Sequence, residues 1–152
     1  MRRIALVLAL VMVAGPALAA RYVSLRSDKA FLREGPTYQH RVLFIYKRKD
    51  YPLQILSAYE SCRKVRDVDG TIGWMSQTML SDQRTVLVTG HGTAVLHAAA
   101  DSGSSIVAKA EPGVVAKLRA CKPQFCEIIA DSQKGWIDRT RIWGVDAGEI
   151  IN

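Results

Sequence analysis

The sequence has no apolar run long enough to cross a bilayer, since the longest extends over residues 4–14. These 11 residues are about half of the ~20 that a transmembrane helix needs, so we expect no stable membrane insertion. Arg2 and Arg3 precede the run and the small residues of Ala17-Leu18-Ala19 follow it, a pattern typical of a secretory signal peptide. Residues 1–19 are predicted to be cleaved on export, which makes the mature protein periplasmic or secreted.

Cysteine and histidine are scarce, with three residues of each. Structural zinc needs four ligands, and only His40, His91 and His97 accompany the cysteines, with no second cysteine pair at zinc-ribbon spacing. We therefore predict no metal site. For Cys62 a small buried apolar residue is favoured over a nucleophile or an intermolecular bridge.

Motifs of known enzyme classes are absent as well. The chain has no phosphate-binding loop and no nucleophile elbow. Ser61 and Lys64 have the Ser-x-x-Lys spacing of penicillin-interacting enzymes, but the partner motifs of that class are missing and the stretch lies in a predicted strand. We expect no enzymatic activity and no cofactor.

The chain is basic, with a formal net charge of +7 that falls to +5 when Arg2 and Arg3 are removed with the signal peptide. Export takes the protein away from most nucleic acid, so nucleic acid is not an expected partner. Anionic lipid heads, cell-wall polymers and acidic proteins remain as partners for a basic surface. Ordinary solubility accounts for a charge of this size equally well.

The chain contains an internal repeat of about 63 residues. Residues 22–25, 30–32 and 42–43 match residues 86–89, 94–96 and 106–107 at an offset of 64, Cys62 matches Phe125 at 63, and Gly73-Trp74 matches Gly135-Trp136 at 62. Because order, spacing and residue type are kept together, the repeat predicts two copies of one structural unit.

Each copy is rich in strand signals. Residues 53–56 and 63–66 are short β-rich segments, and the Asp69-Gly70 turn leads into the strand that contains Gly73-Trp74. No segment after residue 20 has a sustained helical periodicity. We predict an all-β protein with one small barrel over residues 22–80, a short linker over residues 81–84, a second barrel over residues 85–144 and a C-terminal tail over residues 145–152. A linker this short and poor in glycine cannot act as a flexible tether, so the barrels are expected to touch.

Two motifs in the first copy resemble those of bacterial SH3 (SH3b) domains. Residues 32–37 (Leu-Arg-Glu-Gly-Pro-Thr) resemble the opening turn of that family, and residues 63–74 resemble its closing hairpin. More narrowly, the chain is similar to tandem SH3-like proteins exported by Gram-negative bacteria. The resemblance implies two SH3-like barrels that recognise peptides or cell-wall material and have no chemistry of their own. The second copy replaces the Gly-Pro turn with residues 97–101 and is therefore expected to be the weaker binder.

Cys121 and Cys126 bracket a loop of four residues that contains a proline, between two strand-like stretches. Facing residues of an antiparallel ladder have Cα atoms about 4.5–5.5 Å apart, which a disulfide accepts. The compartment of an exported protein is oxidising. We therefore predict a disulfide between Cys121 and Cys126.

Aromatic residues are concentrated in the first copy, and some of them lie in or near predicted loops. Arg33, Glu34, Tyr38 and Tyr51 are the predicted ligand-binding residues, because rings on an SH3-like surface suit extended peptides. Trp74 and Trp136 are predicted to be buried because each follows a glycine inside a strand. Residues 47–49 form a basic run in a loop, which we expect to be solvated.

Two functions fit these observations. The first is a module that recognises peptidoglycan or its stem peptides, and the second is a protein-protein adaptor or structural partner of an envelope complex. The expected partner is thus a cell-wall peptide or an envelope protein. The sequence does not distinguish between these two partners, and it does not indicate an oligomeric state.

Overall fold

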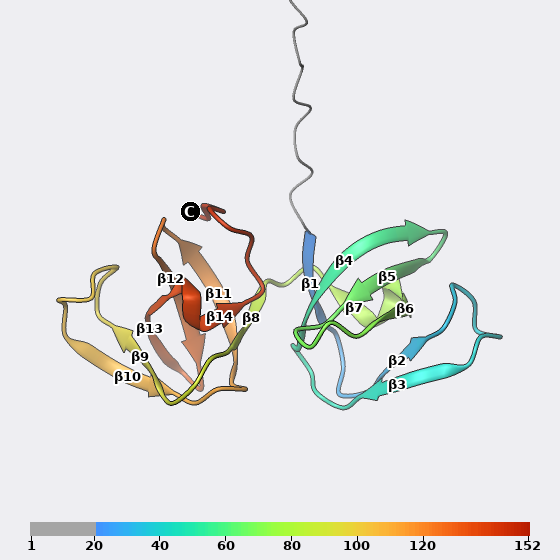
Figure 1. Cartoon of the computed structure of the whole chain (residues 1–152), viewed down its shortest axis with the longest axis horizontal. Coiled ribbons are helices and arrows are strands. Elements are labelled where there is room, and N and C mark those ends of the chain that lie inside the picture. The colour runs from blue at the N-terminus through green and yellow to red at the C-terminus, as the bar shows by residue number, and fades with distance from the viewer. Residues whose placement is uncertain (1–20) are drawn as a thin grey trace, which may run out of the picture.

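The computed structural model describes residues 21–152, so the predicted signal peptide at residues 1–19 lies outside the described residues. This part of the chain forms two seven-stranded antiparallel sheets, each of which curls into a small barrel (Figure 1). The fold confirms the predicted all-β class and the tandem SH3-like barrels. Between residues 21 and 152, no helix is long and apolar enough to span a membrane.

Barrel 1 contains β1 (Arg21–Leu25), β2 (Ala30–Arg33), β3 (Val42–Tyr46), β4 (Pro52–Tyr59), β5 (Cys62–Arg66), β6 (Ile72–Ser76) and β7 (Leu80–Ser81), in the spatial order β3-β2-β6-β5-β4-β1-β7. A single 3-10 turn, η1 (Gln77–Met79), separates β6 from β7. The Asp69-Gly70 turn joins β5 to β6, and Gly70 has the positive φ of 85° that such a turn requires.

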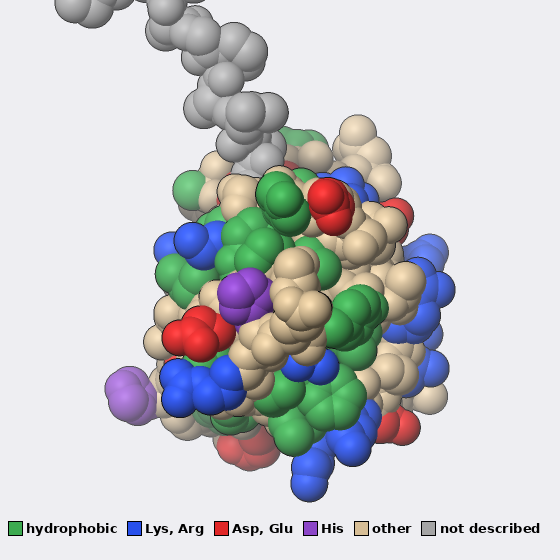
Figure 2. Space-filling model, turned by 90° about the vertical axis from the view of Figure 1, so that its right-hand side faces the viewer, with side chains coloured by type: hydrophobic (Ala, Val, Ile, Leu, Met, Phe, Trp, Pro, Cys, Tyr) green, Lys and Arg blue, Asp and Glu red, His purple; other side chains and the backbone are tan. Residues whose placement is uncertain are grey.

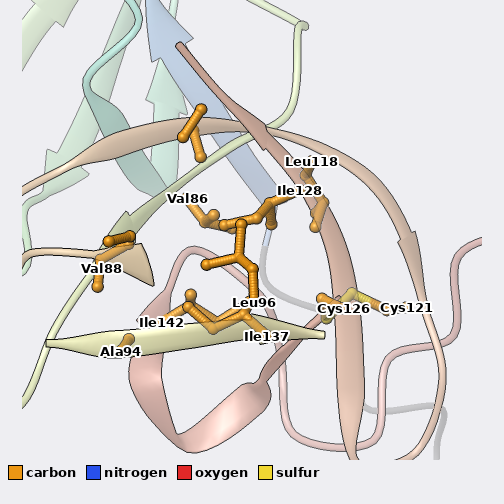
Figure 3. Packing of buried hydrophobic residues seen from close by; sticks show 13 residues of the cluster. Val86, Val88, Ala94, Leu96, Leu118, Cys121, Cys126, Ile128, Ile137 and Ile142 are labelled. Carbon is orange, nitrogen blue, oxygen red and sulfur yellow. A yellow bond between two sulfur atoms is a disulfide. The ribbon is translucent and has the colours of Figure 1, made fainter. Parts of the chain in front are cut away.

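Barrel 2 repeats this plan with β8 (Thr85–Val88), β9 (Ala94–His97), β10 (Ile106–Ala110), β11 (Val115–Cys121), β12 (Phe125–Ala130), β13 (Gln133–Asp138), η2 (Arg139–Arg141) and β14 (Ile142–Trp143), in the order β10-β9-β13-β12-β11-β8-β14. Each barrel has its own core of buried apolar side chains, and Figure 3 shows that of barrel 2 with the disulfide at its edge. The two copies are therefore separate packing units.

The Gly-Trp strand explains why each barrel closes. At Gly73 a Cβ atom would lie 2.6 Å from Leu32 Cγ and 2.9 Å from the Arg33 carbonyl oxygen, and at Gly135 it would lie 2.7 Å from Leu96 Cβ. Glycine is thus required where β6 crosses β2 and where β13 crosses β9.

The prediction that Trp74 and Trp136 are buried is wrong. Successive residues of a strand point to opposite faces. Because Gly73 and Gly135 take the inward position, the tryptophans point outward, and both are only half buried. Each ring is partly covered from outside, Trp74 by Tyr59 and Trp136 by the Lys122 ammonium.

The repeat also needs a correction at its first strand. Leu25 lies opposite Leu80 in barrel 1, and Val88 lies opposite Ile142 in barrel 2. The structural offset of this strand is therefore 63 and not 64, so Val23 corresponds to Val86, and both are buried. The one-residue difference is taken up in the loop before β9, and from β2 onward the predicted offset holds.

The two barrels touch through the ends of their sheets, as expected from the short connection. The rings of Tyr22 and Trp143 meet edge to face at 5.4 Å between centroids. The Thr85 hydroxyl donates a hydrogen bond of 2.7 Å to the Asp50 carbonyl across the contact. The Arg84 guanidinium lies 5.6 Å from the Tyr22 ring centroid.

The last residues of the chain pack against barrel 2. Arg84 donates hydrogen bonds of 2.8 and 3.1 Å to the two carboxylate oxygens of Glu149. These bonds hold the pKa of the Glu149 carboxyl below its usual range, so the pair stays charged at neutral pH. Ile151 then exchanges two backbone hydrogen bonds with Cys121, at 2.8 and 3.1 Å.

The predicted disulfide between Cys121 and Cys126 is confirmed. The two residues lie directly opposite each other on β11 and β12, with Cα atoms 4.1 Å apart. Cys62 is buried and free, which agrees with its interpretation as a small apolar residue of barrel 1.

Candidate functional site

Three of the four predicted binding residues lie at one end of the β2–β3 hairpin. Arg33 is the last residue of β2 and lies opposite Val42 of β3, and Glu34 and Tyr38 belong to the loop between them. Tyr51 comes after the opposite end of this hairpin. The structure therefore brings Arg33, Glu34 and Tyr38 together and leaves Tyr51 apart from them.

Arg33 holds the loop that carries Tyr38. Its Nη1 donates hydrogen bonds to the carbonyl oxygens of Tyr38 and His40, at 3.2 and 2.9 Å. Its guanidinium carbon lies 5.6 Å from the Tyr38 ring centroid and 5.9 Å from that of Phe31. One cation is thus shared between two rings, and Tyr38 remains 67% exposed.

The same face of the sheet extends on both sides of Arg33. Ile45 lies opposite Phe31, Trp74 lies opposite Arg33, and the Tyr59 ring meets Trp74 edge to face at 6.5 Å. Figure 2 views the molecule from the barrel 1 end and shows hydrophobic side chains with Lys and Arg between them. We call this set the aromatic face and define it as Phe31, Arg33, Tyr38, Ile45, Tyr59 and Trp74.

The aromatic face is bordered by an open strand edge. β3 is the outermost strand of its sheet, and its consecutive residues Leu43, Phe44 and Ile45 are 45%, 50% and 40% exposed. Edge strands of this kind offer unpaired backbone groups beside apolar side chains.

The Glu34 side chain forms only an exposed ion pair beside the aromatic face. Its carboxylate lies 3.7 Å from the Arg41 guanidinium, and both side chains are more than half exposed. Such a pair is screened by water and stabilises little. Both groups are therefore free to exchange partners with a ligand.

Tyr51 lies in a separate polar cluster. Its ring is 5.7 Å from that of Tyr46, whose hydroxyl donates a hydrogen bond of 2.8 Å to a carboxylate oxygen of Asp67. Burial, together with the nearby Asp67 charge, raises the pKa of Tyr51 to about 12. Half-buried and neutral, Tyr51 is placed to pack against its neighbours more than to meet a ligand.

In barrel 2, different residues occupy the positions at the centre of the aromatic face. His97 occupies the position of Arg33, since it lies opposite Trp136. His97 is buried, and its Nδ1 lies 3.1 Å from the Ser104 carbonyl oxygen, so it too fastens the following loop. That loop carries Ser102 at the position of Tyr38. The exposed ring of barrel 1 therefore has no counterpart in barrel 2.

Two pockets were missed by sequence reasoning. A pocket of about 350 Å³ at one end of barrel 1 is lined by Arg21, Arg26 and Arg63 with several neighbours. A second pocket, of about 380 Å³, lies between the barrels and includes Arg48, Lys49 and Lys117. The three arginines are spread over 43 residues of sequence, so no local pattern could have indicated them. Arg48 and Lys49 belong to the basic run at residues 47–49, for which the sequence predicts solvation.

Metal ligands do not gather in the part of the chain that the structure describes. No group of three or more His, Cys, Asp or Glu side chains there could hold a metal ion.

Two curled antiparallel sheets, each with a glycine-tryptophan strand packed on its second strand, define a tandem SH3-like protein. The bacterial SH3 domain family matches residues 26–82 and 90–144. These two segments make up well over half of the chain, which therefore belongs to the bacterial SH3 domain family and carries two copies of the domain.

The solved structures that match the chain share little sequence with it. NlpC2 from Trichomonas vaginalis is 14% identical with a TM-score of 0.37, and the match covers 84% of this chain and 49% of that one. An NlpC/P60 family protein from Bacillus cereus is 12% identical with a TM-score of 0.36, and the match covers 80% and 55%. The chain thus spans about half the length of these structures. No curated protein is significantly similar to it.

Proposed function

We propose that the protein is an exported, non-catalytic module that binds peptidoglycan or its stem peptides through the aromatic face of barrel 1. The observation that carries this proposal is the Arg33 guanidinium shared by the Phe31 and Tyr38 rings next to an open strand edge. Membership of the bacterial SH3 domain family supports a binding role related to the cell wall.

The chemistry of the face suits a short acidic peptide. Nη1 of Arg33 is used by the loop carbonyls, while Nε and Nη2 make no hydrogen bond within residues 21–152, so they can pair with a ligand carboxylate. Tyr38 offers a flat ring at little entropic cost, and β3 can add backbone hydrogen bonds to an extended chain. Stem peptides present carboxylates on an extended backbone, which matches these three elements.

Export is part of the same proposal. The pattern of residues 1–19 is typical of a signal peptide, and a disulfide joins Cys121 and Cys126. Disulfides persist in oxidising compartments such as the periplasm. Both features support a periplasmic or secreted protein.

A role as an adaptor in an envelope complex is the second candidate. The apolar residues Leu43, Phe44 and Ile45 along β3 favour it, because an exposed apolar edge strand also suits a strand of another protein. Such an adaptor would not bind isolated wall material, and it would be captured with one envelope protein after crosslinking.

Sedimentation with purified peptidoglycan tests the proposed function. We expect the mature protein to pellet with the wall, and a Tyr38→Ala variant to lose about tenfold in affinity because a ring contact of this kind contributes ~1–2 kcal/mol. The double change Arg33→Ala and Tyr38→Ala should abolish pelleting. An Ile106→Ala change on β10 removes an exposed apolar side chain from barrel 2 and serves as the matched control. Wall binding that is equal in all of these variants would contradict the proposal.

A further inference from the structure

One end of barrel 1 is open and basic. Arg63 shares its side of β5 with the fully buried Val65, so its side chain leaves from the inner face at the end of the barrel. Arg26 lines the same pocket and donates two hydrogen bonds to the Leu80 carbonyl oxygen. Arg63 donates through Nη1 to the carbonyl oxygens of Glu60 and Cys62 and through Nη2 to Gln77 Oε1, the last at 2.7 Å. Arg21 completes the set and pairs with Asp82, the one acidic residue that lines this pocket.

The corresponding end of barrel 2 is closed by the chain itself. Cys126 corresponds to Arg63, because Cys126 lies opposite Ile137 and Arg63 lies opposite Met75 in the equivalent strand pairs. Cys121 corresponds to Ala58, because each lies on the preceding strand of its sheet, directly opposite one of these two residues. The disulfide therefore occupies the site where barrel 1 has Arg63.

The C-terminal segment completes this closure through a single β-bridge at Ile151. Ile151 pairs with Cys121 through two backbone hydrogen bonds and packs against the core of barrel 2. Arginine side chains hold the segment, since Arg84 binds the Glu149 carboxylate and Arg139 donates to the Glu149 and Asp146 carbonyl oxygens. One barrel end of this protein thus accommodates an acidic segment that turns between Asp146 and Glu149 and pairs with the barrel edge at Ile151.

Barrel 1 has the same edge without an occupant among residues 21–152. β4 pairs with β1 only as far as Ile55, opposite Arg21, and beyond that point no described segment pairs with this edge of the strand. Both barrels have a bulge here, between Ile55 and Ser57 and between Leu118 and Ala120. The backbone of Ala58 therefore has the position and setting that Cys121 has in barrel 2.

We propose that the open end of barrel 1 binds an acidic peptide segment of another protein, which pairs with β4 at Ala58 and places a carboxylate on Arg21, Arg26 and Arg63. Three arginines against one aspartate give the charge complementarity. Ile55 lines the pocket, is partly exposed and can contact an aliphatic side chain of the segment. The tail of a second copy is a poor occupant because Glu149 and Ile151 are already bound to their own barrel.

This site is distinct from the aromatic face and its test needs no cell wall. A fluorescent peptide with the sequence of residues 145–152 is titrated with the full mature protein by anisotropy. We expect saturable binding that weakens with salt, and at least about tenfold weaker binding to Arg63→Gln, because each lost charge-assisted hydrogen bond costs that much. Arg21→Gln should weaken binding as well. The Arg21 side chain is exposed, so weaker binding of this variant would not be explained by misfolding.

Matched controls make the result specific. Arg119→Gln on β11 removes the same charge from an exposed residue outside the pocket and should leave peptide binding unchanged. A peptide with Asp146→Asn and Glu149→Gln should bind at least about tenfold more weakly. Equal binding of this neutral peptide, or binding indifferent to both Arg21→Gln and Arg63→Gln, overturns the proposal. A concentration-dependent dimer that the acidic peptide dissociates would assign the site to a second copy and would also overturn it.

Discussion

Replacing Gly73 with alanine is expected to lower the free energy of unfolding of barrel 1 by about 1–3 kcal/mol. The new Cβ would lie 2.6 Å from Leu32 Cγ and 2.9 Å from the Arg33 carbonyl oxygen. Leu32 is fully buried and the Arg33 carbonyl belongs to the backbone, so neither can simply rotate away. β2 must separate from β6, and Arg33 moves with it.

Urea unfolding followed by circular dichroism and tryptophan fluorescence measures this effect. Gly103→Ala is the matched control, since a Cβ there would meet only the Asp101 side chain at 3.5 Å or more. The control should change stability by less than about 0.5 kcal/mol. If Gly73→Ala were as stable as the control, the close crossing of β2 and β6 would not limit the choice of residue, contrary to our account of the Gly-Trp strand.

Reducing the disulfide is expected to lower the stability of barrel 2 by about 2 kcal/mol. The ring closed by Cys121 and Cys126 is small, so the chain-entropy contribution is modest. Both cysteines are almost fully buried, and Cys121 also pairs with Ile151. Loss of the link should therefore loosen the C-terminal segment as well as the barrel.

The measurement compares unfolding with and without reductant. A Cys121→Ala, Cys126→Ala double variant should no longer respond to reductant, whereas Cys62→Ala should respond as the wild type does because Cys62 is free. Sensitivity to reductant that disappears in Cys62→Ala would show that Cys62 takes part in a disulfide and would be incompatible with the pairing described here.

The sequence was sufficient to predict the duplicated all-β fold because its strongest signals are local. The Gly-Trp pair and the Asp69-Gly70 turn each have one structural explanation, and the cysteine pair brackets a single short loop. The offset of the first strand was wrong by one residue because the extra residue lies in the loop before β9, and residues 22–25 resemble the second copy at either offset. The tryptophans were misplaced because the inward position is decided by β2, a strand about 40 residues away.

The candidate sites were less predictable. Arg33 and Tyr38 belong to one loop, and their proximity could be expected, whereas their function remains a prediction. Arg21, Arg26 and Arg63 converge only when the barrel has formed. Barrel 2 closes the same end with a disulfide and with its own C-terminal segment. This correspondence becomes visible only from the pairing register of the strands, which the sequence does not show.

The two copies differ at the positions that form the candidate sites of barrel 1. Barrel 2 replaces the exposed Tyr38 position with Ser102, the Arg33 position with the buried His97 and the open end with the disulfide. Barrel 1 keeps an exposed ring, an available guanidinium and an open strand edge. In the proposed function barrel 1 is therefore the binding unit, and barrel 2 supports it through the Tyr22–Trp143 contact.

Amide chemical shifts of the full mature chain, recorded while soluble peptidoglycan fragments are added, test this division most directly. The account predicts shifts at Phe31, Arg33 and Tyr38 and along β3, with the amides of barrel 2 unchanged. Shifts confined to barrel 2, or an unchanged spectrum at every fragment concentration, would contradict it.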